Sequence, residues 1–152
     1  MRILADSNIL IAGLIRTHVH HSVVSPWMQA FRAKRVELIF AAHSVAETYS
    51  VMTRGPFQPA MTPAEVWNLI QANILPFATI QTLTQAEYLA TLTRLAANGL
   101  GGGLVYDSLI AQVAELAAVD LLLTFNTKHY IRLPSASVLR VESPLNIQPP
   151  SN

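Results

Sequence analysis

Arg2-Ile3-Leu4-Ala5-Asp6-Ser7-Asn8 is the stretch that indicates most about the fold of this chain. Residues 2–5 have the length and apolar character of a short buried strand, and Asp6-Ser7-Asn8 then form the turn at its carboxyl end. A carboxylate beside a core is costly unless it is paired or bound to a cation. Taken alone, Asp6 would be an ordinary turn aspartate that caps the next helix. A different role for Asp6 can be inferred only from other parts of the chain.

Three further stretches place a possible metal ligand at the edge of an apolar run. Glu47 ends His43-Ser44-Val45-Ala46-Glu47, Asp107 precedes Ser108-Leu109-Ile110-Ala111, and Asn126 follows Leu121-Leu122-Leu123-Thr124-Phe125. The chain has only 9 acidic residues, so three of them at such edges argue against a merely solvating role. Converging carboxylates repel one another and stay ionised together only around a cation. The four stretches therefore indicate a metal site.

The composition suits a single domain that hides part of its surface. A chain of 152 residues is long enough for one domain with a core. Apolar residues make up 51% of it and charged residues only 12%, roughly half the usual share of about 25%. Such a surface is expected to lie partly against a partner or a second copy. The absence of cysteine excludes disulfides, iron–sulfur clusters and thiolate zinc sites, and a net charge of +1 is too small to indicate nucleic-acid binding by itself.

No membrane segment or signal peptide is expected. Arg2 and Asp6 bracket an apolar segment that is too short for a signal peptide. The longest apolar stretch, Leu104–Phe125, contains three carboxylates, which argues against a membrane helix. We therefore expect a cytoplasmic protein without a membrane anchor.

Strands are predicted to alternate with helices along the chain. The strands are predicted at residues 2–5, 36–41, 75–80, 120–124 and 138–141. The helices are predicted at residues 9–15, 26–35, 44–54, 62–72, 84–97 and 104–117. Pro26 is expected in the first turn of its helix with Ser25 as the cap, and Thr62 and Thr84 each begin a capping box.

This alternation, without any hairpin signal, predicts one α/β domain with a mainly parallel sheet. The domain is expected to span residues 1–143, followed by a flexible tail at residues 144–152. Ligands of such sheets bind beyond the carboxyl ends of the strands. Asp6 and Asn126 lie just past two strand ends, and Glu47 and Asp107 lie in helices that can lean over the same edge.

The motifs, taken together and in order, resemble those of PIN-domain nucleases, most closely the VapC-type toxins of toxin–antitoxin pairs. The resemblance covers residues 1 to about 143 and rests on Asp6-Ser7-Asn8, Glu47, Tyr106-Asp107-Ser108-Leu109-Ile110-Ala111, and Thr124-Phe125-Asn126-Thr127-Lys128-His129-Tyr130. It implies a PIN-like α/β/α sandwich. It also implies Mg²⁺- or Mn²⁺-dependent cleavage of RNA.

The resemblance also implies the site residues. Asp6, Glu47 and Asp107 match the three acidic positions of the family, and Asn126 matches a fourth that is Asp in many members, so one charge is missing here. We hypothesise that Asp6 and Asp107 ligate the main ion, while Glu47 ligates it or orients the attacking water. Asn126 would hold a metal-bound water or an Asp carboxylate. His129 stands where many members have an acidic residue.

Several other side chains are expected to support the site. The hydroxyls of Ser7 and Thr124 are candidates to fix the rotamers of the metal-binding carboxylates. Basic side chains near the ends of the motifs are candidates to contact RNA phosphates. These candidates are Arg54, Lys128, His129 and Arg132.

The resemblance further implies an antitoxin partner and a homodimer. The helices predicted at 62–72 and 84–97 are the expected surface for the second copy or the antitoxin. The low charge and high apolar content of the chain agree with such a covered face.

Two other functions remain open from the sequence. One is phosphotransfer with Asp6 as nucleophile, although such families usually have a second Asp close by and here Ser7 and Asn8 follow. The other is a PIN-fold module that only binds RNA or protein, because Asn126 weakens the site. His18, His20 and His21 suggest zinc only weakly and are expected to lie in a solvated loop.

Overall fold

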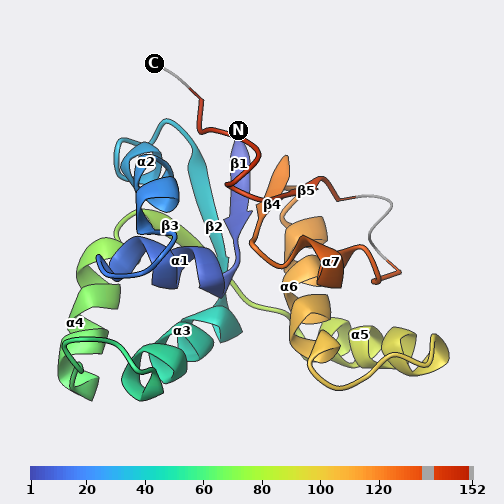
Figure 1. Ribbon diagram of the computed structural model, residues 1–152. Coiled ribbons are helices and arrows are strands. Elements are labelled where there is room, and N and C mark those ends of the chain that lie inside the picture. The colour runs from blue at the N-terminus through green and yellow to red at the C-terminus, as the bar shows by residue number, and fades with distance from the viewer. Residues whose placement is uncertain (135–138, 151–152) are drawn as a thin grey trace.

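The computed structural model describes residues 1–134 and 139–150 and shows a central sheet with helices on both faces (Figure 1). The sheet has the strand order β3-β2-β1-β4-β5, and every neighbouring pair is parallel. The predicted α/β/α sandwich is therefore confirmed, and the sheet is parallel throughout its described strands. The strands are β1 (Arg2–Ala5), β2 (Glu37–Ala41), β3 (Ala78–Gln81), β4 (Leu121–Leu123) and β5 (Val141–Glu142).

Successive residues of the central strands enter two separate cores because side chains alternate between the faces of a sheet. In β1, Ile3 and Ala5 pack into one core, whereas Leu4 packs into the other. In β4, Leu121 and Leu123 join the first core and Leu122 joins the second. The continuous apolar runs of these strands thus reflect burial on both faces, as expected for a parallel sheet.

Four helices cover the first face of the sheet and three cover the second (Figure 1). The first group is α1 (Ser7–Leu14), α2 (His21–Arg32), α3 (Ala42–Arg54) and α4 (Pro63–Asn73). The second group is α5 (Gln85–Ala97), α6 (Leu104–Leu116) and α7 (Thr127–Tyr130). Among the described residues, no helix combines the length and the apolar character needed to cross a membrane.

The two predicted capping boxes are both formed. Thr62 accepts a hydrogen bond from the backbone N–H of Glu65, whose carboxylate accepts one from the backbone N–H of Thr62. Thr84 and Glu87 make the same reciprocal pair at the start of α5. Both helices begin where the sequence predicts because each cap satisfies two backbone donors locally.

The prediction for Pro26 was wrong. Helix α2 begins at His21, five residues before Pro26, which lies inside the helix. The backbone N–H groups of Val23 and Val24 both bond to the carbonyl of His20, so the helix is already formed when the chain reaches the proline. The carbonyl that Pro26 leaves without a helical partner belongs to Ser22, which is exposed, so water can satisfy it.

The short C-terminal elements also differ from prediction. Helix α7 has only four residues and too little periodicity to be recognised. Strand β5 is described at Val141–Glu142, whereas the predicted strand began at Val138, which lies outside the described residues. In the tail, Ile147 packs against the first core and the Arg35 guanidinium donates to the carbonyl of Pro150. The domain boundary at residue 143 stays a prediction.

Candidate metal centre

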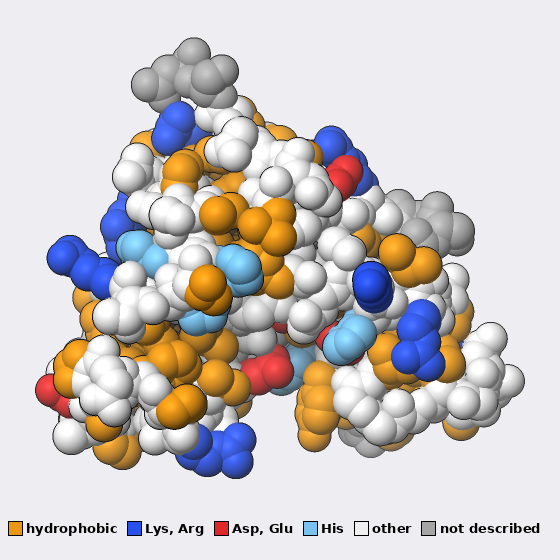
Figure 2. All heavy atoms as spheres, in the orientation of Figure 1, with side chains coloured by type: hydrophobic (Ala, Val, Ile, Leu, Met, Phe, Trp, Pro, Cys, Tyr) orange, Lys and Arg blue, Asp and Glu red, His pale blue; other side chains and the backbone are white. Residues whose placement is uncertain are grey.

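Four predicted site residues line one cavity at the carboxyl edge of the sheet. Asp6 directly follows β1, and Asn126 follows the neighbouring strand β4. Glu47 comes from α3, and Asp107 comes from the first turn of α6. All four side chains border a cavity of about 430 Å³. Figure 2 shows acidic and histidine side chains meeting in a hollow between the α3 side and the α6 side of the molecule.

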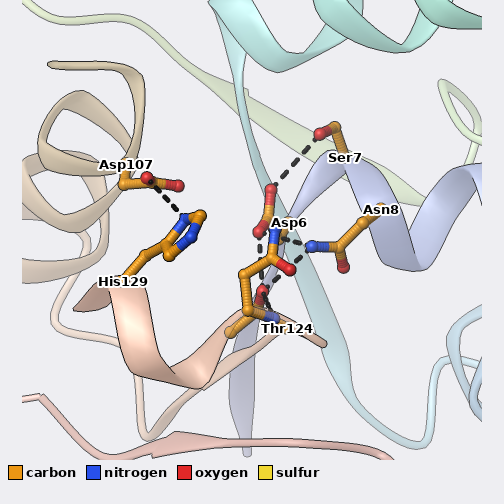
Figure 3. Close-up of polar contacts among 7 residues, drawn as sticks. Asp6, Ser7, Asn8, Asp107, Thr124 and His129 are labelled. Atoms are coloured by element: carbon orange, nitrogen blue, oxygen red, sulfur yellow. Dashed lines mark hydrogen bonds and ion pairs between the residues drawn. The ribbon is translucent and has the colours of Figure 1, made fainter. Parts of the chain in front are cut away.

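Asp6 is a buried carboxylate that accepts three side-chain hydrogen bonds (Figure 3). Only 3% of the residue is exposed. Its Oδ2 accepts from the Thr124 hydroxyl at 2.7 Å and from the Asn8 amide at 2.9 Å, and its Oδ1 lies 3.3 Å from the Ser7 hydroxyl. These contacts hold the carboxylate in one orientation toward the cavity.

Asn8 joins the strand ends around Asp6, although it is not one of the site residues predicted from the sequence. Its amide donates to the Thr124 hydroxyl at 3.1 Å, and its carbonyl oxygen accepts from the backbone N–H of Phe125 at 3.2 Å. Asn after a strand is commonly just a turn former, which hides this role in the sequence. Only the adjacency of β1 and β4 brings residues 8 and 124 together.

The Thr124 hydroxyl is expected to contribute measurably to stability. It donates to Asp6 and accepts from the Asn8 amide and from the backbone N–H of Asn126 at 3.0 Å. Thr124→Val removes one hydrogen-bond partner from each of these three groups. We therefore expect a loss of about 1–3 kcal/mol in the free energy of unfolding. Chemical denaturation of the purified variant measures this value.

Thr48→Val is a matched control for that change. Thr48 is as fully buried as Thr124, but its hydroxyl has no hydrogen-bond partner among the described residues. Removing an unpaired buried hydroxyl should leave stability unchanged or raise it slightly. Equal losses in the two variants would contradict the assignment of the Thr124 hydroxyl to this network.

Asp107 contacts the cavity from the opposite wall. Its carboxylate Oδ2 lies 3.2 Å from Nδ1 of His129, which is half exposed on α7 (Figure 3). The Asp107 side chain itself is 14% exposed. The imidazole can donate to the carboxylate and limit its rotation without closing the cavity.

The two aspartates repel each other and resist ionisation. Burial raises the pKa of Asp6, and the negative charge of Glu47 raises it further, against the opposing hydrogen bond from Thr124. Burial also raises the pKa of Asp107, followed by the charge of Asp6. Among the described residues, the ion pairs formed by arginine involve Glu37 and Glu142, and none reaches these site carboxylates. A cation in the cavity would supply the missing positive charge.

The donor set fits a hard divalent ion held partly through water. All the candidate ligands offer oxygen, the donor that Mg²⁺ and Mn²⁺ prefer. In the part of the chain that the structure describes, no three acidic or histidine side chains are close enough to form a complete ligand group. Mg²⁺ usually keeps several waters and binds directly to only one or two carboxylates, so this spacing agrees with that ion.

A second cavity of about 480 Å³ adjoins the first and shares Glu47, Asp107 and Asn126 with it. His129 and Arg132 also line it and present nitrogen donors beside the carboxylates. Arg54 lines a further cavity that again includes Glu47. Lys128 is exposed on α7. Three of the four residues predicted to contact RNA phosphates therefore line cavities that also include Glu47.

Tyr130 is a buried neighbour of the site that the sequence does not reveal. It is 1% exposed, and its hydroxyl has no hydrogen-bond partner of normal geometry among the described residues. Burial raises the pKa of Tyr130 well above its ordinary value, and the charges of Asp6, Asp107 and Glu47 raise it further. The hydroxyl therefore stays protonated near these carboxylates and remains available as a hydrogen-bond donor.

Of the three N-terminal histidines expected in a solvated loop, His18 and His20 do lie in the turns before α2, whereas His21 begins that helix. His18, His20 and His21 are all partly buried. The Nδ1 of His21 lies 2.9 Å from the carbonyl oxygen of Ala12, and the His20 ring stacks on Phe125. His18 and His20 line the cavity that contains Asp6. These contacts need the tertiary fold and have no signal in the local sequence.

Most of this chain is similar in sequence to proteins of one known family. The family model described as PIN domain matches residues 3–134. Ribonuclease VapC27 of Mycobacterium tuberculosis is 34% identical over 120 residues, which are 76% of this chain and 82% of that protein. Ribonuclease VapC40 of the same species is 30% identical over 121 residues, which are 77% of this chain and 81% of that protein.

Solved structures with low sequence identity share the fold. The crystal structure of M. tuberculosis VapC20, described as a sarcin–ricin loop cleaving toxin, superposes with a TM-score of 0.69 at 12% identity, covering 97% of this chain and 99% of that one. A VapBC2 complex from Rickettsia felis, bound to a promoter DNA fragment, gives 0.66 at 18% identity, with 94% and 98% covered. The family model and the two curated relatives show that this chain belongs to the PIN-domain family, in its VapC-type group.

Proposed function

We propose that this protein is a metal-dependent endoribonuclease and the toxin of a toxin–antitoxin pair. The observation that carries the proposal is the meeting of Asp6, Glu47 and Asp107 on one open cavity without an arginine or lysine partner among the described residues. Its curated relatives are named ribonucleases, and several structural neighbours are toxin–antitoxin complexes. Because the proposed substrate is cellular RNA, the proposal includes the cytoplasmic location expected from the sequence.

Each site residue has a proposed role. Asp6 and Asp107 would hold one Mg²⁺ or Mn²⁺, and Glu47 would bind it directly or orient the attacking water. Asn126 would position a bound water or an aspartate. The bound ion supplies a more acidic water and neutralises the charge that grows on the phosphate. The hydroxyls of Ser7 and Thr124 fix the Asp6 carboxylate in place.

The nitrogen donors around the site suit RNA phosphates. Arg132 and His129 line one cavity that includes Glu47, and Arg54 lines another. Lys128 is exposed on the same short helix as His129. Contacts between these side chains and phosphates release counterions, so RNA binding should weaken as salt rises. Binding that is insensitive to salt would exclude this role.

Metal removal tests the proposed activity. The purified protein, freed of any bound partner, should cleave single-stranded RNA in the presence of Mg²⁺ or Mn²⁺. EDTA should abolish cleavage, and excess Mn²⁺ should restore it, because the carboxylates cannot act on the phosphate by themselves. Full cleavage after complete removal of divalent metal, measured on a labelled RNA by gel electrophoresis, would refute the mechanism.

We also propose a homodimer and an antitoxin partner. Helices α4 and α5 carry exposed large apolar side chains, and an apolar cavity of about 600 Å³ lies between α3 and α4. The exposed large apolar residues on these helices are Trp67, Tyr88 and Leu89. We expect light scattering to report twice the 16.6 kDa mass of the chain. A strict monomer that also captures no antitoxin-like partner in a pull-down would contradict this assembly.

A binding module with a weakened site is the remaining alternative. Asn126 occupies the fourth position of the site and brings no charge, which is the feature that favours this alternative. The two functions differ in the effect of an aspartate-to-asparagine change on RNA cleavage.

A further inference from the structure

The cavity beside Asp6 is lined by two chemically different sets of side chains. One set offers the oxygen donors of Asp6, Glu47, Asp107 and Asn126. The rest of the lining is mainly aromatic and aliphatic, and it includes four rings. These rings belong to His18, His20, Phe57 and Phe125. Figure 2 shows histidine side chains gathered beside the acidic hollow.

Two of these rings stack on each other. The ring centroids of His20 and Phe125 are 4.6 Å apart, and the planes are inclined by 26°. The His18 ring lies next to His20 at 5.8 Å in a tilted arrangement. His20 and Phe125 are both half-buried, so their rings are supported by the protein yet still border the cavity.

The stack is held at a fixed place relative to Asp6. Phe125 lies between Thr124, which bonds to Asp6, and Asn126, which also lines the cavity. The backbone N–H of Phe125 donates to the Asn8 side chain, which also bonds to Asp6. The same network therefore positions the Asp6 carboxylate and Phe125.

We propose that His20 and Phe125 form a nucleobase-stacking subsite for a nucleotide next to the cleaved phosphodiester. This inference rests on the proposed ribonuclease function and adds to it a recognition element. A nucleotide carries a phosphate and an aromatic base a few bonds apart, and this cavity is lined both by carboxylates that can attract a metal and by aromatic rings. Stacking is tolerant of base identity because every base has a π-face, so the subsite selects for a base rather than for a sequence.

The test compares RNA with a chain that has no bases. Fluorescence anisotropy measures binding of a short single-stranded RNA and of a base-free ribose–phosphate chain of the same length, with Ca²⁺ present to suppress cleavage. His20→Ala should weaken RNA binding roughly 5- to 100-fold. It should leave binding of the base-free chain unchanged, because that chain has nothing to stack on the ring.

Two further variants separate stacking from other effects. His20→Phe keeps an aromatic face and should restore most of the RNA affinity. Val19→Ala changes the neighbouring residue, which is 81% exposed, and should bind RNA as the wild type does. Changing His20 rather than Phe125 avoids a folding defect, because Phe125 also packs against the first core.

The inference is overturned if His20→Ala binds RNA as tightly as the wild type, or if it loses equal affinity for both chains. It is also overturned if the wild type binds both chains equally. Binding is measured without cleavage, so a wild type that binds RNA through the stack but never cuts it would refute the proposed nuclease function alone. The two failures are therefore distinguishable.

Discussion

Asp107→Asn is expected to lower RNA cleavage about a thousandfold while leaving the protein folded, since even outer-shell partners of a metal contribute roughly 10–100-fold. The change removes one of the two carboxylates proposed to hold the ion. The asparagine can still accept the hydrogen bond from His129, so α6 and α7 keep their contact. Single-turnover cleavage with saturating Mn²⁺ measures the loss, and circular dichroism verifies folding.

Glu115→Gln provides a control on the same helix. It exchanges a carboxylate for an amide in α6, eight residues beyond Asp107 and away from the residues that line the acidic cavity. Its cleavage rate should equal that of the wild type. If Asp107→Asn also cleaves at the wild-type rate, the metal-dependent mechanism fails. If neither the wild type nor any variant cleaves RNA but all bind it, the binding module is the correct function.

Asp6→Asn is expected to abolish cleavage and, in the metal-free protein, to raise stability. The buried Asp6 carboxylate is destabilised by desolvation and by the charge of Glu47. An asparagine can direct its carbonyl oxygen at Thr124 and Asn8 and its amide at the Ser7 hydroxyl, so it can keep the three contacts without the charge. Function and stability should therefore change in opposite directions.

The pH dependence of this gain follows from the raised pKa of Asp6. A carboxyl group whose pKa is higher in the folded state stabilises the fold below its unfolded pKa of about 4. That contribution is lost as the pH rises through the folded pKa. The metal-free wild type should therefore lose stability relative to Asp6→Asn between about pH 4 and neutral pH.

Thermal denaturation in EDTA measures this difference. The variant should melt above the wild type at pH 7, by roughly 2–4 °C for each kcal/mol gained, and the gap should close near pH 4. Adding Mn²⁺ should raise the melting temperature of the wild type but not that of the variant. A variant that melts below the wild type at pH 7 would show that the carboxylate is not destabilised by its surroundings.

The sequence predicts the fold well where local patterns carry the information. Residues 2–5 and 121–123 are short apolar runs, and they form the buried central strands. The capping patterns at Thr62 and Thr84 locate two helix starts because the cap is made within four residues. In contrast, Pro26 suggests a helix start that the longer segment around it overrides.

The site is predictable only in part, for a physical reason. Ligand positions at strand ends follow from the parallel sheet, so Asp6 and Asn126 could be placed on one edge from the sequence. The groups that hold Asp6 depend on contacts between residues more than a hundred positions apart, such as that between Asn8 and Thr124. The order of strands in the sheet decides these contacts. The same holds for the stack of His20 on Phe125.

The most direct measurement of the central claim is a calorimetric titration of the metal-free protein with Mn²⁺. Binding should be saturable in the wild type and in Glu115→Gln. It should be lost or at least 10-fold weaker in Asp6→Asn and in Asp107→Asn, because each removes one proposed ligand. Equal Mn²⁺ affinity in all four proteins would show that these carboxylates do not form the metal site and would contradict the account.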